Sequence, residues 1–361
     1  MRAALVGVGQ AGGKLTRAIV EQDGRFGPDT VVGAVAVNTA QADLEPLPLR
    51  TLLVGQSRVN GHGVGGDNEL GAEVLREDRA EVLDALDGIV TAETEAILVV
   101  AGLGGGTGSG GAPVICRALR EVYDIPVYVL GILPGRDEGA MYQVNAGRSL
   151  KTVTREADAT VLVDNDAFRT SGESVEEGFA SINGEIARRV GLLLAAGEVD
   201  SDGAVGESVV DTSEVINTLR AGGIAAVGYA SAVASEDAGE NVNVVTSVVR
   251  RAIRTGMSLP GATQAESGLV VVAGRPERVP RKGVERARRW VEDETGSMQV
   301  RGGDYPVESD HVAALVLLGG IERSERVAAF VDRAREAAAA ADEEGVDPAT
   351  AFETEEIDDL F

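Results

Sequence analysis

The sequence predicts an α/β protein with a Rossmann-like parallel-sheet domain, a long central helix and a smaller mixed-sheet α/β domain after it. Three observations support this fold class. Short apolar runs alternate with segments of helical periodicity over residues 3–163, a pattern typical of parallel sheets covered by helices on both faces. A long amphipathic segment follows at 174–196, and strand-like runs become frequent after residue 222.

The first part of the chain contains five predicted strands, each of them a short apolar run. They are expected at 3–8, 31–37, 96–101, 127–133 and 160–163. Between them, apolar residues recur at steps of three and four, which predicts helices. These helices are expected at 11–22, 69–90, 111–123 and 139–157.

The central helix is predicted at 174–196, where Phe179, Ile182 and Ile186 fall on one inward, apolar stripe. Further strands are expected at 224–234, 268–273, 297–302 and 311–318, and further helices at 243–255, 283–294 and 323–341. The chain should therefore divide into a first domain at 1–173, the central helix, a loop and helix at 197–222, a second domain at 223–341 and an acidic tail at 342–361. We expect the tail to be unstructured until it is bound.

Composition excludes several classes of function. Lys and Arg number 33 and Asp and Glu 58, so the net charge is 33 − 58 = −25. This charge opposes binding to nucleic acid or anionic lipid, because like charges repel. A single cysteine excludes an internal disulfide framework, and two histidines cannot build a His-rich zinc site. We find no apolar run of about 18 residues, the length of a membrane span, and expect a cytoplasmic protein.

The first glycine-rich loop, residues 7–14, follows a predicted strand and contains the pattern GxGxxG. Glycines let backbone N–H groups approach phosphate oxygens, and the start of the following helix favours anions. A dinucleotide site would need an acidic residue after the second strand, where this chain has Asn38 and Thr39. A P-loop would need other residues in place of Val8 and Leu15. A purely structural tight turn is the alternative.

Two more glycine-rich loops follow, at 61–67 and 102–111. The first of these is by itself best interpreted as a flexible linker. The second has seven glycines in ten residues, and glycine costs about 0.5–1 kcal/mol relative to alanine in regular elements. A structural turn needs only one or two glycines. We therefore expect backbone amides of this loop to surround a polyphosphate, with the hydroxyls of Thr107 and Ser109 as further donors.

The motif GGGTGSG at 104–110 resembles the signature of the tubulin/FtsZ family, and other segments resemble that family in the same order. These segments are GQAGGK at 9–14, AVNTAQADL at 36–44, GHGVGGDNELG at 61–71, GRDEGAMYQVNAGRSL at 135–150 and VVDTSEVINTL at 209–219. The low lysine content and the acidic segment EEIDDLF are most like the CetZ group of haloarchaea.

The resemblance implies that GTP or GDP binds across the strand ends and that Mg²⁺ bridges two of its phosphates. It identifies no residue of this chain as a metal ligand. Glu138 falls in the family's sugar-contacting segment and Asn183 where the central helix contacts guanine. From the residues alone, Glu138 could equally be a solvated acid, and Asn183 an amide satisfied by backbone. The implied nucleotide-binding residues are Gly9, Gln10, Ala11, Gly12, Gly13, Lys14, Asn38, Gly65, Gly66, Gly104, Gly105, Gly106, Thr107, Gly108, Ser109, Gly110, Glu138, Tyr142, Asn165, Phe179 and Asn183.

Asp211 and Glu214 are the catalytic candidates. Their spacing of three puts both on one face of a helix start, where ordinary capping by Asp and Glu is the alternative role. The resemblance implies that this loop projects into the nucleotide of the next subunit. The chain would then assemble with itself, head to tail, into open filaments, and GTP hydrolysis would depend on that assembly.

Three residues depart from the family pattern, namely Lys14, Tyr142 and Val209. Two of them, Lys14 and Val209, leave open a GTP-binding scaffold that hydrolyses little and modulates another filament. The GxGxxG pattern leaves open an NAD-dependent oxidoreductase, which Asn38 opposes.

The resemblance also suggests a role in cell shape and a cytoskeletal location at the cell envelope. Residues 355–361 place Ile357, Leu360 and Phe361 among acids. This pattern is consistent with docking to an adaptor or a membrane-linked protein, or with a solubilising tail.

The composition also predicts salt dependence. Only three of the 33 basic residues are lysines, and such acidic, lysine-poor surfaces suit molar salt, where the screening length falls to about 3 Å. We predict that the midpoint of thermal unfolding rises between low and molar KCl, because the salt screens repulsion among the carboxylates. Circular dichroism melts at several KCl concentrations measure this, and an unchanged midpoint would contradict the prediction.

Overall fold

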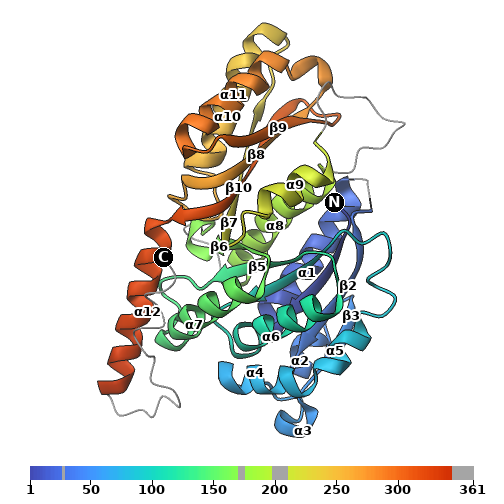
Figure 1. Ribbon diagram of the computed structural model, residues 1–361, viewed down its shortest axis with the longest axis vertical. Helices are drawn as coiled ribbons and strands as arrows, with labels where there is room; N and C mark the ends of the chain where they lie inside the picture. The colour runs from blue at the N-terminus through green and yellow to red at the C-terminus, as the bar shows by residue number, and fades with distance from the viewer. Residues whose placement is uncertain (27–28, 170–174, 197–209, 344–361) are drawn as a thin grey trace.

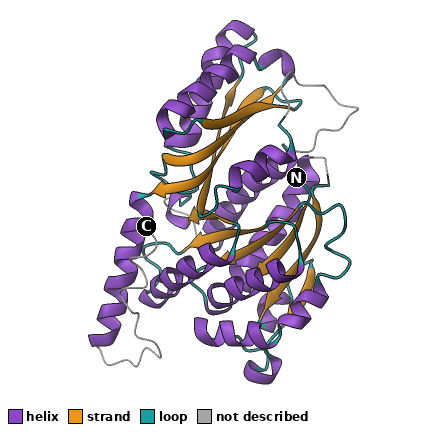
Figure 2. Ribbon diagram, viewed as in Figure 1, coloured by secondary structure: helices purple, strands orange, loops and turns teal. Residues whose placement is uncertain are grey.

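A computed structural model describes residues 1–26, 29–169, 175–196 and 210–343. Within these ranges the strands form one twisted sheet in the order β3-β2-β1-β4-β5-β6-β7-β10-β8-β9. Figures 1 and 2 show the sheet running through the molecule, with helices on both of its faces. The strands are β1 (Ala3–Val8), β2 (Val31–Asn38), β3 (Arg50–Leu53), β4 (Ala96–Gly102), β5 (Val127–Leu133), β6 (Ala159–Asp164), β7 (Ile224–Val233), β8 (Gln264–Gly274), β9 (Gln299–Pro306) and β10 (His311–Arg323).

Twelve described helices cover this sheet, together with two short 3₁₀ turns. The helices are α1 (Gly9–Phe26), α2 (Gln41–Leu44), α3 (Gln56–Val59), α4 (Asn68–Glu77), α5 (Arg79–Ala85), α6 (Gly106–Val122), α7 (Ala140–Glu156), α8 (Val175–Ala195), α9 (Thr212–Leu219), α10 (Ala238–Arg254), α11 (Arg281–Thr295) and α12 (Glu325–Glu343). The turns are η1 (Asn165–Ala167) and η2 (Pro276–Arg278). None of the helices described is long and apolar enough to cross a membrane.

The N-terminal half of the sheet is parallel from β3 to β7. The five strands predicted for this half are present. Strand β3 was not predicted, because this edge strand has only four residues and exposes the first two, Arg50 and Thr51. A short strand without an apolar run carries little periodic signal.

The C-terminal half of the sheet is mixed, as predicted. Strand β10 pairs antiparallel with β7 and β8, and β9 lies parallel to β8. The two halves meet at a narrow junction, where β6 and β7 share only the pairs Thr160↔Ile224 and Val161↔Ala225. Beyond this junction, β7 pairs with β10, and this pairing joins the two halves into one sheet.

Two details of the predicted helices are wrong. The single helix expected at 69–90 is broken into α4 and α5 at Asp78, where the backbone leaves helical geometry (φ −95°, ψ 17°) and the carboxylate accepts the Gly55 N–H at 2.6 Å. The supposed loops at 7–14 and 102–111 are largely helical, because α1 begins at Gly9 and α6 at Gly106.

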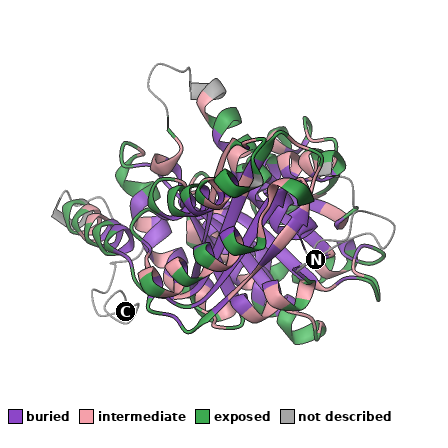
Figure 3. Cartoon of the chain, turned by 90° about the horizontal axis from the view of Figure 1, so that it is seen from above, coloured by how far each residue is buried: buried purple, intermediate pink, exposed green. Residues whose placement is uncertain are grey.

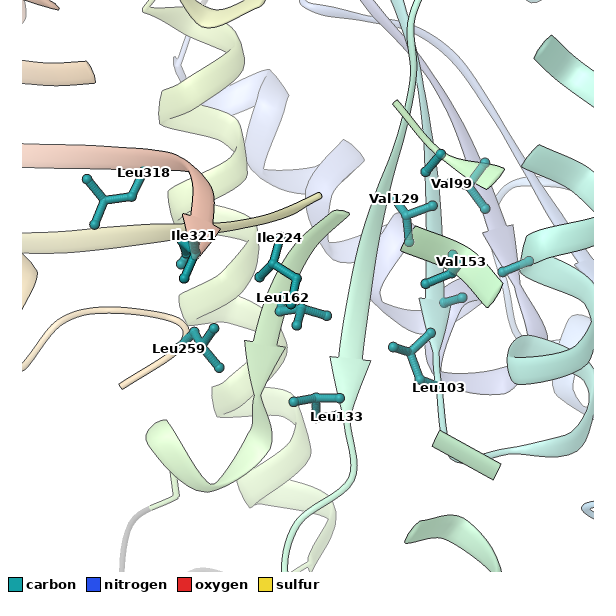
Figure 4. Packing of buried hydrophobic residues seen from close by; sticks show 14 of the residues in the cluster. Val99, Leu103, Val129, Leu133, Val153, Leu162, Ile224, Leu259, Leu318 and Ile321 are labelled. Atoms are coloured by element: carbon teal, nitrogen blue, oxygen red, sulfur yellow. The ribbon is translucent and has the colours of Figure 1, made fainter. Parts of the chain in front are cut away.

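Apolar side chains fill two layers, one on each face of the sheet. Figure 3 shows that the buried residues gather in and around the sheet. Helices α1, α8 and α9 cover one face, and α4 to α7, α10, α11 and α12 contribute to the other. In Figure 4, Val99 and Val129 of neighbouring strands lie near Val153 of α7, and Leu162 lies beside Ile224. Cys116 of α6 is fully buried in this second layer, and burial raises the pKa of its thiol.

Candidate nucleotide-binding site

A cavity of about 580 Å³ opens at the carboxyl ends of β1 and β4, the usual place for ligands in an open α/β sheet. Its size is typical of small-molecule sites. The segments that line it come from the starts of α1 and α6, the end of β2, the 62–66 loop, the 132–142 segment, η1 and α8. Segments far apart in the sequence therefore converge on one cavity.

The N-terminus of α6 forms one wall of the cavity. Gly105 caps this helix with extended backbone, and Gly104 to Gly108 line the cavity. The first N–H groups of a helix have no partners within the helix, and its dipole favours anions there. Buried Thr107 shares a hydroxyl–hydroxyl hydrogen bond of 2.7 Å with Thr39, which joins this wall to the end of β2. The wall is therefore suited to phosphate.

Beside this wall, Asp43 accepts hydrogen bonds from two side-chain amides. Gln10 Nε2 donates to Oδ1 at 2.7 Å and Asn38 Nδ2 donates to Oδ2 at 3.1 Å. All three residues line the cavity. Asp43 lies within the family segment at 36–44, but the sequence predicted no role for it, because its orientation depends on Gln10, a residue distant in sequence.

The opposite end of the cavity combines polar and aromatic groups. Glu138 Oε1 accepts the Gly135 N–H at 2.7 Å and lies 3.4 Å from Asn165 Nδ2, which donates to it. Tyr142 and Phe179 line the same end and are 40% and 43% exposed. Asn183 is half-buried one turn after Phe179 on α8. An amide, a carboxylate and two accessible rings can contact the base and sugar of a nucleoside.

The exposure of Phe179 corrects the predicted apolar stripe of α8. Ile182 and Ile186 are buried as expected, with exposures of 4% and 1%. Phe179 instead borders the cavity. Helical periodicity groups residues by direction, but it does not distinguish a core from a hollow beside the core.

Four predicted nucleotide-binding residues lie outside the cavity lining, and each has another local role. A Cβ on Gly12 would lie 2.2 Å from the Val100 carbonyl oxygen, and one on Gly110 would lie 1.9 Å from that of Asn68. These glycines therefore permit close backbone packing. Gly13 similarly faces Leu47. The Ser109 hydroxyl donates to the Gly105 carbonyl within its own helix, so it is not the free donor expected.

The remaining predicted residues all line the cavity: Gly9, Gln10, Ala11, Lys14, Asn38, Gly65, Gly66, Gly104, Gly105, Gly106, Thr107, Gly108, Glu138, Tyr142, Asn165, Phe179 and Asn183. The lining also contains residues that the sequence analysis did not select: Val8, Thr39, Ala40, Asp43, His62, Gly63, Val64, Gly102, Ile132 and Pro134. His62 and Thr39 lay within the quoted family segments, which was the available signal. Across the described ranges, no cluster of three or more His, Cys, Asp or Glu side chains could hold a metal.

Asp211 and Glu214 lie at the start of α9, far from this cavity. Thr212 donates a hydrogen bond of 3.2 Å to Glu95, which immediately precedes β4. The cavity lies at the other end of β4, and seven residues of strand span about 20 Å. The two carboxylates therefore cannot reach the cavity of their own subunit.

The environments of the two acids differ. Asp211 is exposed and caps α9 by accepting the Glu214 N–H at 3.1 Å. A hydrogen bond from the Ser213 hydroxyl lowers the pKa of Asp211. Partial burial, followed by the charge of Asp211, raises the pKa of Glu214. Capping thus occurs, and it leaves the Asp211 carboxylate open to solvent. Val209 and residues 355–361 lie outside the described residues.

The fold and the cavity define an α/β nucleotide-binding protein with a helix N-terminus for phosphate and a polar, aromatic end for a nucleoside. Profiles of two protein families match the chain. The one described as the Tubulin/FtsZ family, GTPase domain, matches residues 2–172, and the one described as Tubulin-like CetZ, C-terminal domain, matches residues 172–336. The chain belongs to the tubulin/FtsZ family and, within it, to the CetZ group.

Individual relatives agree with this assignment. The chain is 67% identical over 362 aligned positions to the tubulin-like protein CetZ2 of Haloferax volcanii, with 100% of both chains covered. A solved structure of CetZ2 from that organism, described as a GTPγS-bound protofilament, superposes with a TM-score of 0.91 at 68% identity, covering 95% of this chain and 100% of the other. CetZ1 of the same organism, described as a GDP-bound monomer, gives 0.86 at 48% identity, covering 93% and 99%.

The packing at Gly110 generates a prediction. In Gly110→Ala, the new methyl group would overlap the Asn68 carbonyl, so α4 must move away from the start of α6. We expect a loss of about 1–3 kcal/mol in the free energy of unfolding, with weaker nucleotide binding. Denaturant unfolding and calorimetric titration with GTP measure the two effects.

Gly24→Ala, at an exposed position of α1, is the matched control, since nothing lies within 4 Å of its added Cβ. Helix propensity predicts a gain of up to about 1 kcal/mol there. Equal stability changes in the two variants would show that the α4–α6 approach is not tight.

Proposed function

We propose that the chain binds GTP or GDP in this cavity, hydrolyses GTP and assembles head to tail into filaments. In this proposal Asp211 and Glu214 of one subunit complete the cavity of the next. The observation that carries the proposal is the separation of the two acids from their own cavity by the length of β4. The descriptions of two relatives, a GTPγS-bound protofilament and a GDP-bound monomer, support it.

The phosphates would lie against the start of α6. Backbone N–H groups near Gly105 and Gly106, together with the Thr107 hydroxyl, are the donors there. Lys14 lines the same cavity and supplies a positive charge. Binding then rests mainly on backbone amides and helix polarity, which agrees with the high glycine content of this region.

The nucleoside would lie toward α8. Asn183 can donate to and accept from a guanine edge, and the rings of Phe179 and Tyr142 offer faces for stacking on the base. Glu138 can accept hydrogen bonds from ribose hydroxyls. Asn165 donates to Glu138 and so orients its carboxylate.

Mg²⁺ fits this site with the phosphates as its main ligands. It usually takes one or two carboxylates plus phosphate oxygens and keeps several waters. Asp43, oriented by Gln10 and Asn38, is the lining carboxylate beside the phosphate wall. When bound, Mg²⁺ would compensate the negative charge of the phosphates. The sequence predicted no metal ligand, so Asp43 is an addition to the predicted site.

Hydrolysis requires positioning of water and compensation of charge. Among the residues that the structure describes, the carboxylates lining the cavity are Asp43 and Glu138, both engaged in hydrogen bonds. Exposed Asp211 and half-buried Glu214, brought by a neighbouring subunit, would orient and polarise the attacking water. A site completed by contact is heterologous and extends into an open filament.

The wider assignments remain part of this proposal. Residues 1–173 form the nucleotide-binding unit, 174–196 the central helix, 197–222 the catalytic segment and 223–341 the second domain. The role in cell shape, the location at the envelope and the binding of an adaptor by the tail rest on the family resemblance. Membership of the tubulin/FtsZ family removes the basis for the oxidoreductase alternative.

The two roles of Asp211 can be separated by substitution. Asn is as good an N-cap as Asp, so Asp211→Asn keeps the helix start and removes the charge. We expect a fall in GTP turnover on the order of 100-fold or more, with unchanged GTP affinity. Phosphate release and calorimetric titration measure these. Turnover that survives in Asp211→Asn would show that the residue serves only as a cap.

Sharing of the catalytic site also predicts a dependence on concentration. The GTPase rate per molecule should be low in dilute protein and should rise above a threshold concentration, because only assembled subunits are complete. Phosphate release measured across a dilution series, with light scattering in parallel, tests this. A rate per molecule that does not change with dilution would contradict the shared site.

A further inference from the structure

A buried ionic cluster joins the start of α12 to the end of β6. The Arg326 guanidinium donates to Asp164 Oδ1 at 2.8 Å and to Asp166 Oδ2 at 2.7 Å, and its Nε donates to Asp164 Oδ2. The side chains of Arg326 and Asp164 are only 8% and 2% exposed. One guanidinium fork thus holds two carboxylates, a geometry that lysine cannot reproduce.

The two carboxylates flank Asn165, which lines the nucleoside end of the cavity. Asp164 Oδ1 accepts the Asp166 N–H at 3.2 Å and fixes the turn that carries Asn165. Asp166 also accepts the Arg136 N–H at 3.2 Å and so holds the segment that leads to Glu138. Asn165 and Glu138, the two residues expected near the ribose, are therefore held in place through Asp164 and Asp166. Arg326 binds both of these acids.

Arg326 belongs to the C-terminal half of the chain, although it acts at a turn of the N-terminal half. It follows β10 by three residues, and α12 packs against α7. In the described part of the chain, Arg326 is the cation that pairs with Asp164. Without it, a buried carboxylate would lack a counter-charge beside a second carboxylate, and the turn would have to rearrange.

We propose that Arg326 is a positioning residue for the ribose end of the nucleotide cavity, acting through Asp164 and Asp166 on Asn165 and Glu138. This inference rests on the proposed function, since it takes a guanine nucleotide as the occupant. It adds a residue of the second domain to the site. Arg326 does not line the cavity, so its effect on binding must pass through the residues that do.

A purely structural ion pair would lower stability and weaken all nucleotides equally. A positioning role instead changes the discrimination of the sugar. We therefore compare the dissociation constants of GTP and 2′,3′-dideoxy-GTP, which lacks both hydroxyls that Glu138 would bind. The ratio of the two constants is the readout, with thermal unfolding measured in parallel.

We expect the wild type to prefer GTP by about tenfold or more, because the analogue loses at least one charge-assisted hydrogen bond. Glu138→Ala should reduce the ratio to near one. Arg326→Gln should reduce it similarly, and Arg326→Lys should give an intermediate value. The matched control is Arg335→Gln, in the same helix, where Arg335 pairs with Asp332 at 3.6 Å. It should keep the wild-type ratio.

Asp166→Asn provides a second route if Arg326→Gln does not fold, because Asp166 is less buried, at 19% exposure, and Arg326 keeps Asp164 as its partner. It should reduce the ratio as well. The double variant Glu138→Ala/Arg326→Gln should have the same ratio as Glu138→Ala alone.

The possible outcomes distinguish a failure of the proposed ribose contact from a failure of the positioning role of Arg326. If the wild type does not distinguish the two nucleotides, the ribose role of Glu138 fails and the inference about Arg326 fails with it. If the wild type and Glu138→Ala differ while Arg326→Gln and Asp166→Asn keep the wild-type ratio, the proposed function stands and the positioning role of Arg326 is overturned.

Discussion

The cavity depends on two close approaches between backbone segments. The start of α6 lies against α4 and the start of α1 against β4, with carbonyl oxygens at positions that a side chain on Gly110 or Gly12 would occupy. A helix N-terminus is thereby brought beside the ends of β1 and β2 with its first N–H groups directed into an open space. The rest of the site is arranged around this contact.

Much of this arrangement could be predicted from the sequence. Apolar runs located the long strands, since buried parallel strands are nearly continuous in hydrophobicity. The glycine-rich segments located the wall that we propose for the phosphates, although phosphate binding would explain only part of their glycine content, because Gly12 and Gly110 permit close packing. Helical periodicity could not reveal that Phe179 faces a hollow, which only the family resemblance implied, and it could not reveal that Asp43 is held by Gln10. Both facts depend on contacts between segments distant in the chain.

In the proposed function, Asp211 meets two demands, helix capping and catalysis. A carboxylate at a helix start satisfies orphan N–H groups, and the same position keeps it at the surface, where its pKa is lowered by the Ser213 hydroxyl. Glu214, one turn on, is partly buried and its pKa is raised. Two acids with opposite shifts sit side by side, as is common where carboxylates take different roles. Local stability and chemistry are therefore compatible here.

The burial of Cys116 has a practical consequence. It is the only cysteine of the chain, it is inaccessible, and its raised pKa keeps it as the unreactive thiol rather than the thiolate. A cysteine introduced at any exposed position can therefore be coupled to a maleimide dye without first replacing the native one. Fluorescent subunits can be prepared from an otherwise unaltered sequence.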